Sequence, residues 1–346
     1  MTYLTLRSAL AAGMLALMAM VSADGPTGTL VVSNMNDNTV TVLDVASGRV
    51  LATLPTGEGP HEVAASHDGR WAVVSNYGVR GKPGHTLTVV DIMHLSVART
   101  IDLGSYQRPH GMAFFPGDTL LAVTCQTSKA VLLVDLRTDV VVGTVPTNGL
   151  VSHMLAMSSD GARLFTANMA DGTITQLDVA GRAAMSVIPT AKSDEGIAIS
   201  PDGSTVFVGS NADSIVVVVD VKQGQVIETL RGFGLPYRMA VSPDGRRAVI
   251  TDPVRGEIRI LDAKTRRPLS VIAVPRDSLV ATAEVPGSPS PEGVAMATDS
   301  KWAFVTLQGR NRVVTVDLER GTITRYAPTG VWSDGVAYSS RVVATH

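Results

Sequence analysis

The chain has 346 residues, 45% of them hydrophobic, and its 29 Lys and Arg residues against 31 Asp and Glu residues give a net charge of −2. This slightly acidic balance argues against general nucleic-acid binding, which depends on clustered basic residues. The single cysteine, Cys125, excludes an internal disulfide and covalent haem attachment through a C-x-x-C-H motif. Because residues 121–124 have the composition of a strand, we expect Cys125 to be a buried, inert thiol.

Residues 1–23 have the pattern of an export signal. Arg7 lies in a short polar start, an apolar run follows over 9–21, and small residues precede Asp24. The run is shorter than the roughly 20 residues of a spanning helix, and no comparable run follows, so we expect no membrane anchor. Cleavage after Ala23 would remove one basic residue, bring the net charge to −3 and leave residues 24–346 as a periplasmic or secreted protein.

The remaining chain repeats a short motif seven times. Each copy is a run of mostly apolar residues that ends in aspartate, and the copies recur about every 42 residues with two longer intervals. They are TVTVLD (39–44), TLTVVD (86–91), AVLLVD (130–135), TITQLD (173–178), IVVVVD (215–220), EIRILD (257–262) and RVVTVD (312–317). We interpret the shared aspartate as structural, because its carboxylate can accept backbone N–H bonds in the turn that follows.

Each repeat contains four short runs rich in valine, separated by Gly, Asn and Asp. Such runs are typical of β-strands joined by tight turns, and no stretch of residues 24–346 shows a sustained helical period. Four strands in each of seven units predict an all-β fold, a seven-bladed β-propeller of antiparallel sheets in one domain over 24–346. The chain begins at a second strand, GTLVVSN (28–34), and ends with a lone first strand, DGVAYSS (334–340), so pairing of these ends should close the ring.

Several of these runs resemble the repeat of a known family. The runs LVVSN (30–34), AVVSN (72–76) and LFTAN (164–168), with the V-x-V-L-D and S-P-D-G motifs, are similar to the YVTN-type propeller repeat of bacterial exported proteins. Two departures are Cys125, where the motif has Asn, and the two longer repeats. The resemblance implies the fold; at that level it extends equally to lactonases, streptogramin lyase and haem d1 propellers.

This resemblance places the first strand of each blade beside the central channel. The second residue of each opening segment then lies at one mouth of the channel, in a ring formed by His61, His110, His153, Glu195, Tyr237, Glu292 and Asp334. Three histidines on consecutive blades and a nearby carboxylate form a ligand set for Zn²⁺ or Fe²⁺, so we predict His61, His110, His153 and Asp334 as metal ligands. A structural, water-filled polar ring is the alternative interpretation.

The other ring residues are candidates for catalysis. Glu195 or Glu292 would act as general base, Tyr237 lies in the ring, and Arg238 would orient a carboxylate or phosphate group. Two insertions, 77–85 and 274–291, are expected as loops on the same face, and the second could cover the mouth as a lid or be a surface loop. Basic residues in and near these loops favour a small anionic ligand.

Two functions of different classes follow. The first is an exported metal-dependent lyase or hydrolase that acts on a small, anionic molecule. The alternative is a non-catalytic periplasmic protein that binds a metal, a haem-type tetrapyrrole or a protein partner at the same face. In both cases we expect a monomer that binds no nucleic acid.

Overall fold

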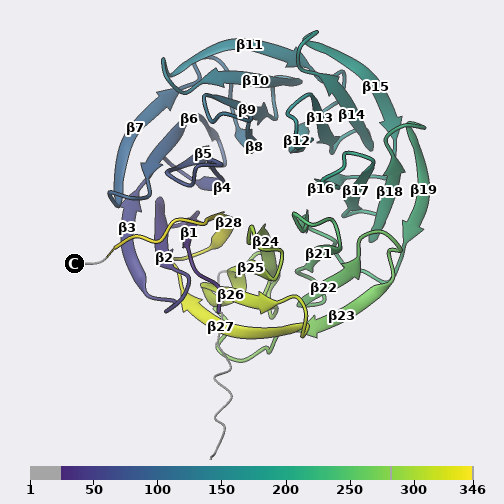
Figure 1. Ribbon diagram of the computed structural model, residues 1–346. Coiled ribbons are helices and arrows are strands. Elements are labelled where there is room, and N and C mark those ends of the chain that lie inside the picture. The colour runs from purple at the N-terminus through teal and green to yellow at the C-terminus, as the bar shows by residue number, and fades with distance from the viewer. Residues whose placement is uncertain (1–24, 281–282, 345–346) are drawn as a thin grey trace, which may run out of the picture.

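The computed structural model describes residues 25–280 and 283–344, so the predicted export signal in residues 1–23 lies outside the described residues. Within them the chain forms seven four-stranded antiparallel sheets arranged as blades around a central channel (Figure 1). The prediction of an all-β, seven-bladed propeller is confirmed. Among the described residues, no helix is long and apolar enough to cross a membrane.

In six blades the strands follow one another outward from the channel in chain order, and in blade 1 the last strand of the chain is the innermost. Blade 1 contains both ends of the chain, in the order β28 (Ser333–Ser339), β1 (Thr29–Asn34), β2 (Thr39–Asp44) and β3 (Val50–Pro55). Blade 2 consists of β4 (Pro60–Ala65), β5 (Trp71–Val79), β6 (Lys82–Asp91) and β7 (Ser96–Asp102); blade 3 of β8 (Pro109–Phe114), β9 (Leu120–Cys125), β10 (Ala130–Asp135) and β11 (Val140–Pro146); and blade 4 of β12 (Ser152–Met157), β13 (Arg163–Asn168), β14 (Thr173–Asp178) and β15 (Ala183–Pro189). Blade 5 consists of β16 (Asp194–Ile199), β17 (Thr205–Ser210), β18 (Ile215–Asp220) and β19 (Gln225–Leu230); blade 6 of β20 (Met239–Val241), β21 (Arg247–Asp252), β22 (Glu257–Asp262) and β23 (Pro268–Ala273); and blade 7 of β24 (Pro291–Met296), β25 (Trp302–Leu307), β26 (Arg312–Asp317) and β27 (Thr322–Pro328). A short 3-10 helix, η1 (Gln308–Arg310), follows β25.

Pairing of the two ends closes the ring, as the sequence predicts. Strand β28 pairs antiparallel with β1, from Thr29 opposite Ser339 to Asn34 opposite Ser333. This pairing covers the inner edge of β1, because the last segment of the chain supplies the strand that the first segment lacks.

The valine-rich middle strands are buried on both faces because a neighbouring blade covers each face. Strands β17 and β18 are buried except at their ends, whereas the outer strand β15 alternates between exposed and covered residues. The described residues form seven hydrophobic clusters, and each cluster joins two neighbouring blades. Cys125 is fully buried in one of them, and burial raises the pKa of its thiol to about 12, which agrees with the predicted inert role.

The repeated aspartate is part of the scaffold. At six of the seven positions its carboxylate accepts a hydrogen bond from the backbone N–H of a residue two or three positions later, as Asp262 does from Lys264 and Thr265. The carboxylate therefore fixes the turn between the third and fourth strands, which confirms its structural interpretation.

Glycine follows the ring residue in four blades, at Gly111, Gly196, Gly293 and Gly335, and the packing of neighbouring inner strands explains it. A Cβ atom on Gly335 would lie 2.5 Å from the carbonyl oxygen of His61, and one on Gly293 would lie 2.2 Å from that of Asp334. These glycines let the inner strands approach closely enough to form a narrow channel.

We expect Gly335→Ala to destabilise the fold by about 1–3 kcal/mol, because the new methyl group overlaps backbone atoms of the adjacent blade. Urea denaturation of the variant and of the native chain measures this loss. Gly25→Ala is the control, since nothing lies within 4 Å of the added atom. Equal stability of Gly335→Ala and Gly25→Ala would contradict the close packing.

Candidate metal centre at the channel mouth

The ring residues project from a bulge at the start of the inner strands. In blade 2, Pro60 pairs with Asn76 and Val63 with Val74, so that His61 and Glu62 stand opposite one residue of β5. The same shift occurs at this position in blades 1, 3, 4, 5 and 7. In blade 6 the strand pairing of β20 begins after this position, at Met239. A bulge turns side chains out of the regular alternation, and here it directs them to the channel.

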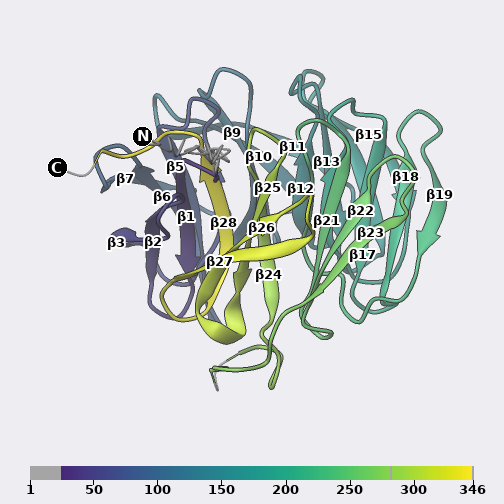
Figure 2. The ribbon, with the colours of Figure 1, turned by 60° about the horizontal axis from the view of Figure 1, so that its bottom comes forward.

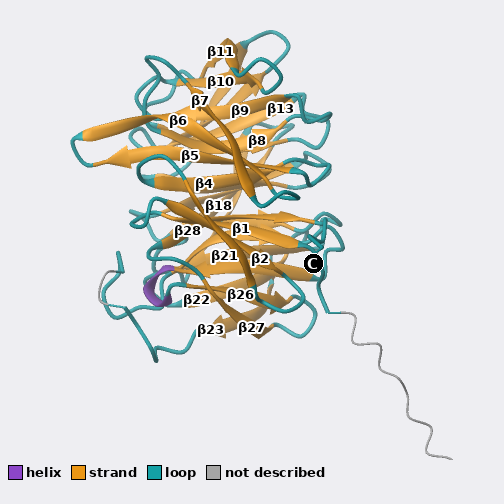
Figure 3. Cartoon of the chain, turned by 90° about the vertical axis from the view of Figure 1, so that its left-hand side faces the viewer, coloured by secondary structure: helices purple, strands orange, loops and turns teal. Residues whose placement is uncertain are grey.

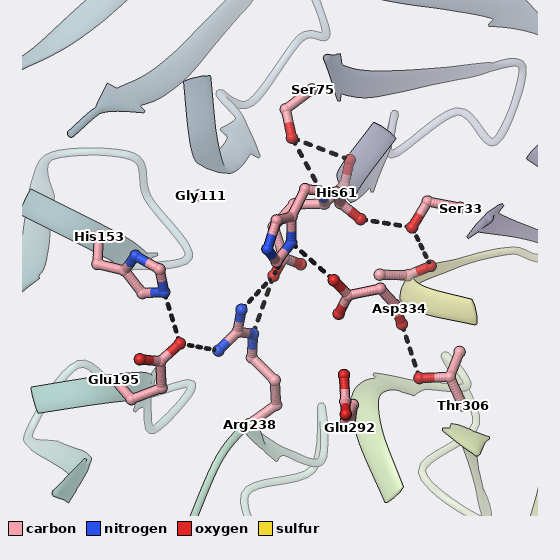
Figure 4. Close-up of polar contacts among 12 residues, drawn as sticks. Ser33, His61, Ser75, Gly111, His153, Glu195, Arg238, Glu292, Thr306 and Asp334 are labelled. Atoms are coloured by element: carbon pink, nitrogen blue, oxygen red, sulfur yellow. Dashed lines mark hydrogen bonds and ion pairs between the residues drawn. The ribbon is translucent and has the colours of Figure 1, made fainter. Parts of the chain in front are cut away.

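Hydroxyl groups on the second strands fix the ring residues from the neighbouring blade. Thr251 Oγ1 donates to the carbonyl oxygen of Glu292 at 2.7 Å, and Thr306 Oγ1 donates to that of Asp334 at 2.6 Å. Ser33 and Thr124 make the same contact with His61 and His153. The backbone of the ring is therefore positioned by contacts between blades (Figure 4).

The three predicted histidines are brought together. The imidazole centroids of His61 and His110 are 4.3 Å apart, and those of His110 and His153 are 3.7 Å apart. Tyr77, at the base of the first insertion, packs edge-on against His61 and His110 at 5.3 and 5.5 Å. The three imidazole rings thus lie in one row along a side of the channel mouth, each tilted against the next.

Both ring nitrogens of His153 are occupied. Its Nε2 lies 2.5 Å from Glu195 Oε1, and its Nδ1 contacts the side-chain amide of Gln126, whose Oε1 accepts a hydrogen bond from Tyr77 at 2.6 Å. If the amide nitrogen of Gln126 donates to Nδ1, the ring is the neutral tautomer with its proton on Nε2; with the amide reversed, both nitrogens carry protons. In either case no lone pair of His153 is free for a metal.

His110 differs in this respect from His153. Its side chain is completely buried, and neither ring nitrogen has a hydrogen-bond partner among the described residues. Burial, followed by the positive potential of His153, His61 and Arg238, lowers the pKa of His110 well below its usual value. A neutral, buried imidazole with two unsatisfied nitrogens requires a partner, because an unpaired buried polar atom is costly.

His61 pairs with the ring carboxylate on its other side. Its Nδ1 lies 2.8 Å from Asp334 Oδ2, although the angle falls outside hydrogen-bond geometry. Burial lowers the pKa of His61, but Asp334 and Glu62 outweigh burial and raise it. Among the described residues, a His61, Glu62 and His110 group places one possible ligand atom from each residue within 4.8 Å of the others.

Arg238 crosses the channel and joins two carboxylates from other blades. Its Nε and Nη2 donate to Glu62 Oε1 at 2.9 and 2.7 Å, and its Nη1 donates to Glu195 Oε1 at 2.7 Å. Burial raises the pKa of Glu195, but His153 and Arg238 outweigh burial and lower it to about 2. The expected contact of Arg238 with an anionic ligand would require that ligand to displace one of these carboxylates.

Glu292 lies on the other side of the ring in a different environment. Its carboxyl group accepts hydrogen bonds from Ser290 Oγ and Gln308 Nε2, both at 2.8 Å. Burial, with the nearby carboxylates of Asp334 and Glu284, raises the pKa of Glu292 well above the usual range. Tyr237 is also buried, which raises the pKa of its phenol well above 10, and Arg238 lies 4.3 Å above its ring.

The formal charges of the site favour a cation. The site holds three buried carboxyl groups, Glu62, Glu195 and Asp334, against the guanidinium of Arg238 and the imidazole of His61, whose pKa is raised. The acidic groups therefore outnumber the basic ones. An anionic ligand would add to the imbalance instead of reducing it.

The two insertions extend from the same side of the propeller (Figure 3), and both contact residues of the ring or their partners. The first, 77–85, is an extension of the β5–β6 hairpin and not the loop that the sequence suggests, because Gly78 pairs with Pro83 and Val79 with Lys82. The second extends beyond the blades between β23 and β24 (Figure 2). Its Glu284 N–H donates to Gln308 Oε1 at 2.7 Å, so it contacts the residue that binds Glu292.

Sequence reasoning missed four residues of the site: Glu62, Tyr77, Gln126 and Gln308. Glu62 follows the ring residue, at a position where four other blades have glycine. Tyr77, Gln126 and Gln308 share one position of the repeat, directly after Asn76, Cys125 and Leu307. An alignment of this second column would have shown polar or aromatic residues next to the ring.

Comparisons with known proteins support the fold. A family model described as YNCE-like beta-propeller matches residues 137–340. The structure of Kuenenia stuttgartiensis hydrazine synthase is similar with a TM-score of 0.67 and 20% identity, over 79% of this chain and 88% of that chain. A functionally unknown protein from Desulfotomaculum acetoxidans is similar with a TM-score of 0.73 and 12% identity, over 90% of this chain and 99% of that chain. A search of curated proteins finds no match.

Proposed function

We propose that this chain, which belongs to the YNCE-like β-propeller family, binds one divalent cation at the mouth of its channel. Membership of the family specifies the fold and no chemistry, so the proposal is argued from the site. His61 and His110, with Glu62, are the proposed ligands. The observation that carries the proposal is His110, a buried neutral imidazole whose two nitrogens have no hydrogen-bond partner among the described residues.

The donor set fits Zn²⁺ or Fe²⁺. Two imidazoles and one carboxylate bind Zn²⁺ in hydrolytic enzymes and Fe²⁺ in non-haem enzymes, with positions left for water or substrate. The surrounding contacts suit such a centre: Arg238 holds Glu62, and Asp334 contacts His61. In this proposal His153 and Asp334, which the sequence suggests as ligands, position the site through Glu195 and His61.

We further propose a metal-dependent lyase or hydrolase that acts on a small molecule. The metal would polarise a carbonyl group or lower the pKa of bound water. Glu292 suits a general acid, because its raised pKa favours the protonated form, whereas Glu195 is too weak a base with a pKa of about 2. Arg238 would hold Glu62 and Glu195 in place instead of binding an anionic substrate.

One observation favours the non-catalytic alternative. His110, Glu195, Arg238 and Glu292 are each at most 3% exposed, so the ring leaves little access for a substrate. A protein that stores or senses a metal ion needs no substrate access. Turnover of ester and lactone substrates by the metal-loaded protein would distinguish the enzyme, and a Soret band in the purified protein would favour a tetrapyrrole ligand.

Elemental analysis of the protein purified from its native compartment tests the metal proposal. We expect about one zinc or iron per chain in the native protein, and loss of at least nine-tenths of it in His110→Ala, because the variant lacks the imidazole whose two nitrogens have no hydrogen-bond partner among the described residues. His67→Ala is the matched control, since His67 is exposed and binds Asp118 on another surface. Circular dichroism verifies folding of each variant. Full metal content in folded His110→Ala would overturn the proposal.

A further inference from the structure

Arg108 is an arginine beside the ring that makes no ion pair with any described residue. Its guanidinium lies over the ring of Tyr77, 4.7 Å from the ring centroid, and its Nη2 donates one long hydrogen bond, of 3.4 Å, to the carbonyl oxygen of Val79. Lys82 in the same region differs, since it pairs with Glu58 at 2.8 Å. A guanidinium has five N–H donors, so Arg108 keeps donors for a ligand.

The backbone fixes Arg108 at this place. The residue lies directly before the inner strand β8 and has a φ of 56°. Its N–H donates to the carbonyl oxygen of Gly84 at 2.8 Å, and its own carbonyl oxygen accepts from the N–H of Gln126 at 3.2 Å. The same position is left-handed in five other blades, at Gly59, Val151, Ser193, Ser290 and Trp332. Because glycine fits such a position without strain, the turn itself does not require an arginine.

Tyr77 connects Arg108 to the proposed metal ligands. The ring of Tyr77 carries the guanidinium over its face and packs edge-on against His61 and His110 at 5.3 and 5.5 Å. His61 is also the ring residue most accessible to solvent, because 12% of its side chain is exposed and the other six ring residues are buried. A small molecule that reaches a metal beside His61 would therefore come close to Arg108.

We propose that Arg108 binds the carboxylate of a small ligand whose second oxygen group binds the metal. The inference rests on the proposed function, because the metal holds the other end of the ligand. The acidic ring alone would repel an anion, whereas a divalent cation and Arg108 together attract one. Guanidinium groups bind carboxylates through two parallel N–H bonds. Arg238, the arginine that the sequence suggests for this role, is already bound to Glu62 and Glu195.

Titration of the cobalt-loaded protein with succinate and with butyrate tests this inference. Co²⁺ binds the same donor types as Zn²⁺, and its visible bands shift when a carboxylate joins it. The two probes have chains of equal length, but only succinate has a second carboxylate for Arg108. We expect Arg108→Met to weaken succinate binding about tenfold and butyrate binding less than about twofold. Arg80→Met, which changes an exposed arginine at the tip of the β5–β6 hairpin, is the control and should bind both probes as the native protein does.

The cobalt bands show whether each variant is folded and loaded. Arg108→Lys should recover part of the succinate affinity, because lysine restores the charge without the paired N–H bonds. Unchanged succinate affinity in cobalt-loaded Arg108→Met would overturn the inference and leave the metal proposal intact. A native protein that shows no cobalt bands would overturn the metal proposal and the inference with it.

Discussion

Arg238→Met is expected to destabilise the protein by about 3–5 kcal/mol, because it leaves Glu62 and Glu195 without their shared cation in a buried site. Methionine nearly matches the length of the aliphatic part of arginine, so lost packing contributes little. From blade 6 the guanidinium donates two hydrogen bonds to Glu62 in blade 2, across the channel, and one to Glu195 in the adjacent blade 5. Urea denaturation measures the change in the free energy of unfolding.

Two further variants make this result specific. Arg246→Met removes an exposed arginine whose ion pair with Asp244 spans 3.8 Å, and we expect it to have nearly native stability. The double variant Arg238→Met/Glu195→Gln should regain part of the loss, since it removes one of the unpaired charges. A loss below about 1 kcal/mol in Arg238→Met would show that the ion pairs across the channel do not stabilise the ring.

Glu292→Gln is expected to stabilise the protein at neutral and alkaline pH. The pKa of Glu292 is raised in the folded state, so between the usual carboxyl range and that higher pKa the folded protein holds a proton that the unfolded chain has released. Stability therefore falls as pH rises through this window, by about 1.4 kcal/mol per pH unit. Glutamine is neutral at every pH and keeps the contacts with Ser290 and Gln308, so the variant should lack this slope.

The free energy of unfolding measured between pH 4 and pH 9 tests this prediction. Asp194 contributes a separate slope that ends near pH 7, because burial raises the pKa of its carboxyl group to about 7. The informative quantity is thus the difference between the native protein and Glu292→Gln at each pH. Glu319→Gln, an exposed carboxylate, should show no difference. A difference that stays constant with pH would mean that Glu292 is ionised in the folded protein.

The fold was predictable because its signal is repeated. Seven aspartates at nearly equal intervals and four valine-rich runs in each unit indicate both the strand number and the closed ring, and the structure confirms both. The ring at the channel mouth also follows from the repeat, since one position in each unit must reach one place near the axis. The three histidines and the neighbouring Glu195 and Asp334 meet as this symmetry requires.

The chemistry of the ring was less predictable, because it depends on residues that break the repeat. Glu62 and Arg238 occupy a position that holds glycine in four other blades, and only the three-dimensional channel shows that they face each other. The side-chain contacts of His153 depend on Gln126, which lies in the neighbouring blade. Periodicity identifies equivalent positions; hydrogen bonds between different blades cannot be read from it.

The basic residues illustrate the same limit. The sequence places Arg276 and Arg310 near the second insertion, where they suggest an anionic ligand. In the structure Arg276 donates to the carbonyl oxygens of Gly287 and Arg255, and Arg310 pairs with Asp277 at 3.3 Å. These side chains hold the insertion against the propeller, so their cationic groups bind atoms of the chain itself and not a ligand.

Anomalous diffraction at the zinc or iron absorption edge from metal-loaded crystals tests the central claim most directly. The account predicts one peak at the channel mouth, about 2.0–2.2 Å from a ring nitrogen of His61 and of His110, with a carboxylate oxygen of Glu62 at a similar distance. His153 should keep its contacts with Gln126 and Glu195. A channel mouth without a peak, in crystals that bind the metal elsewhere or do not bind it, would contradict the account.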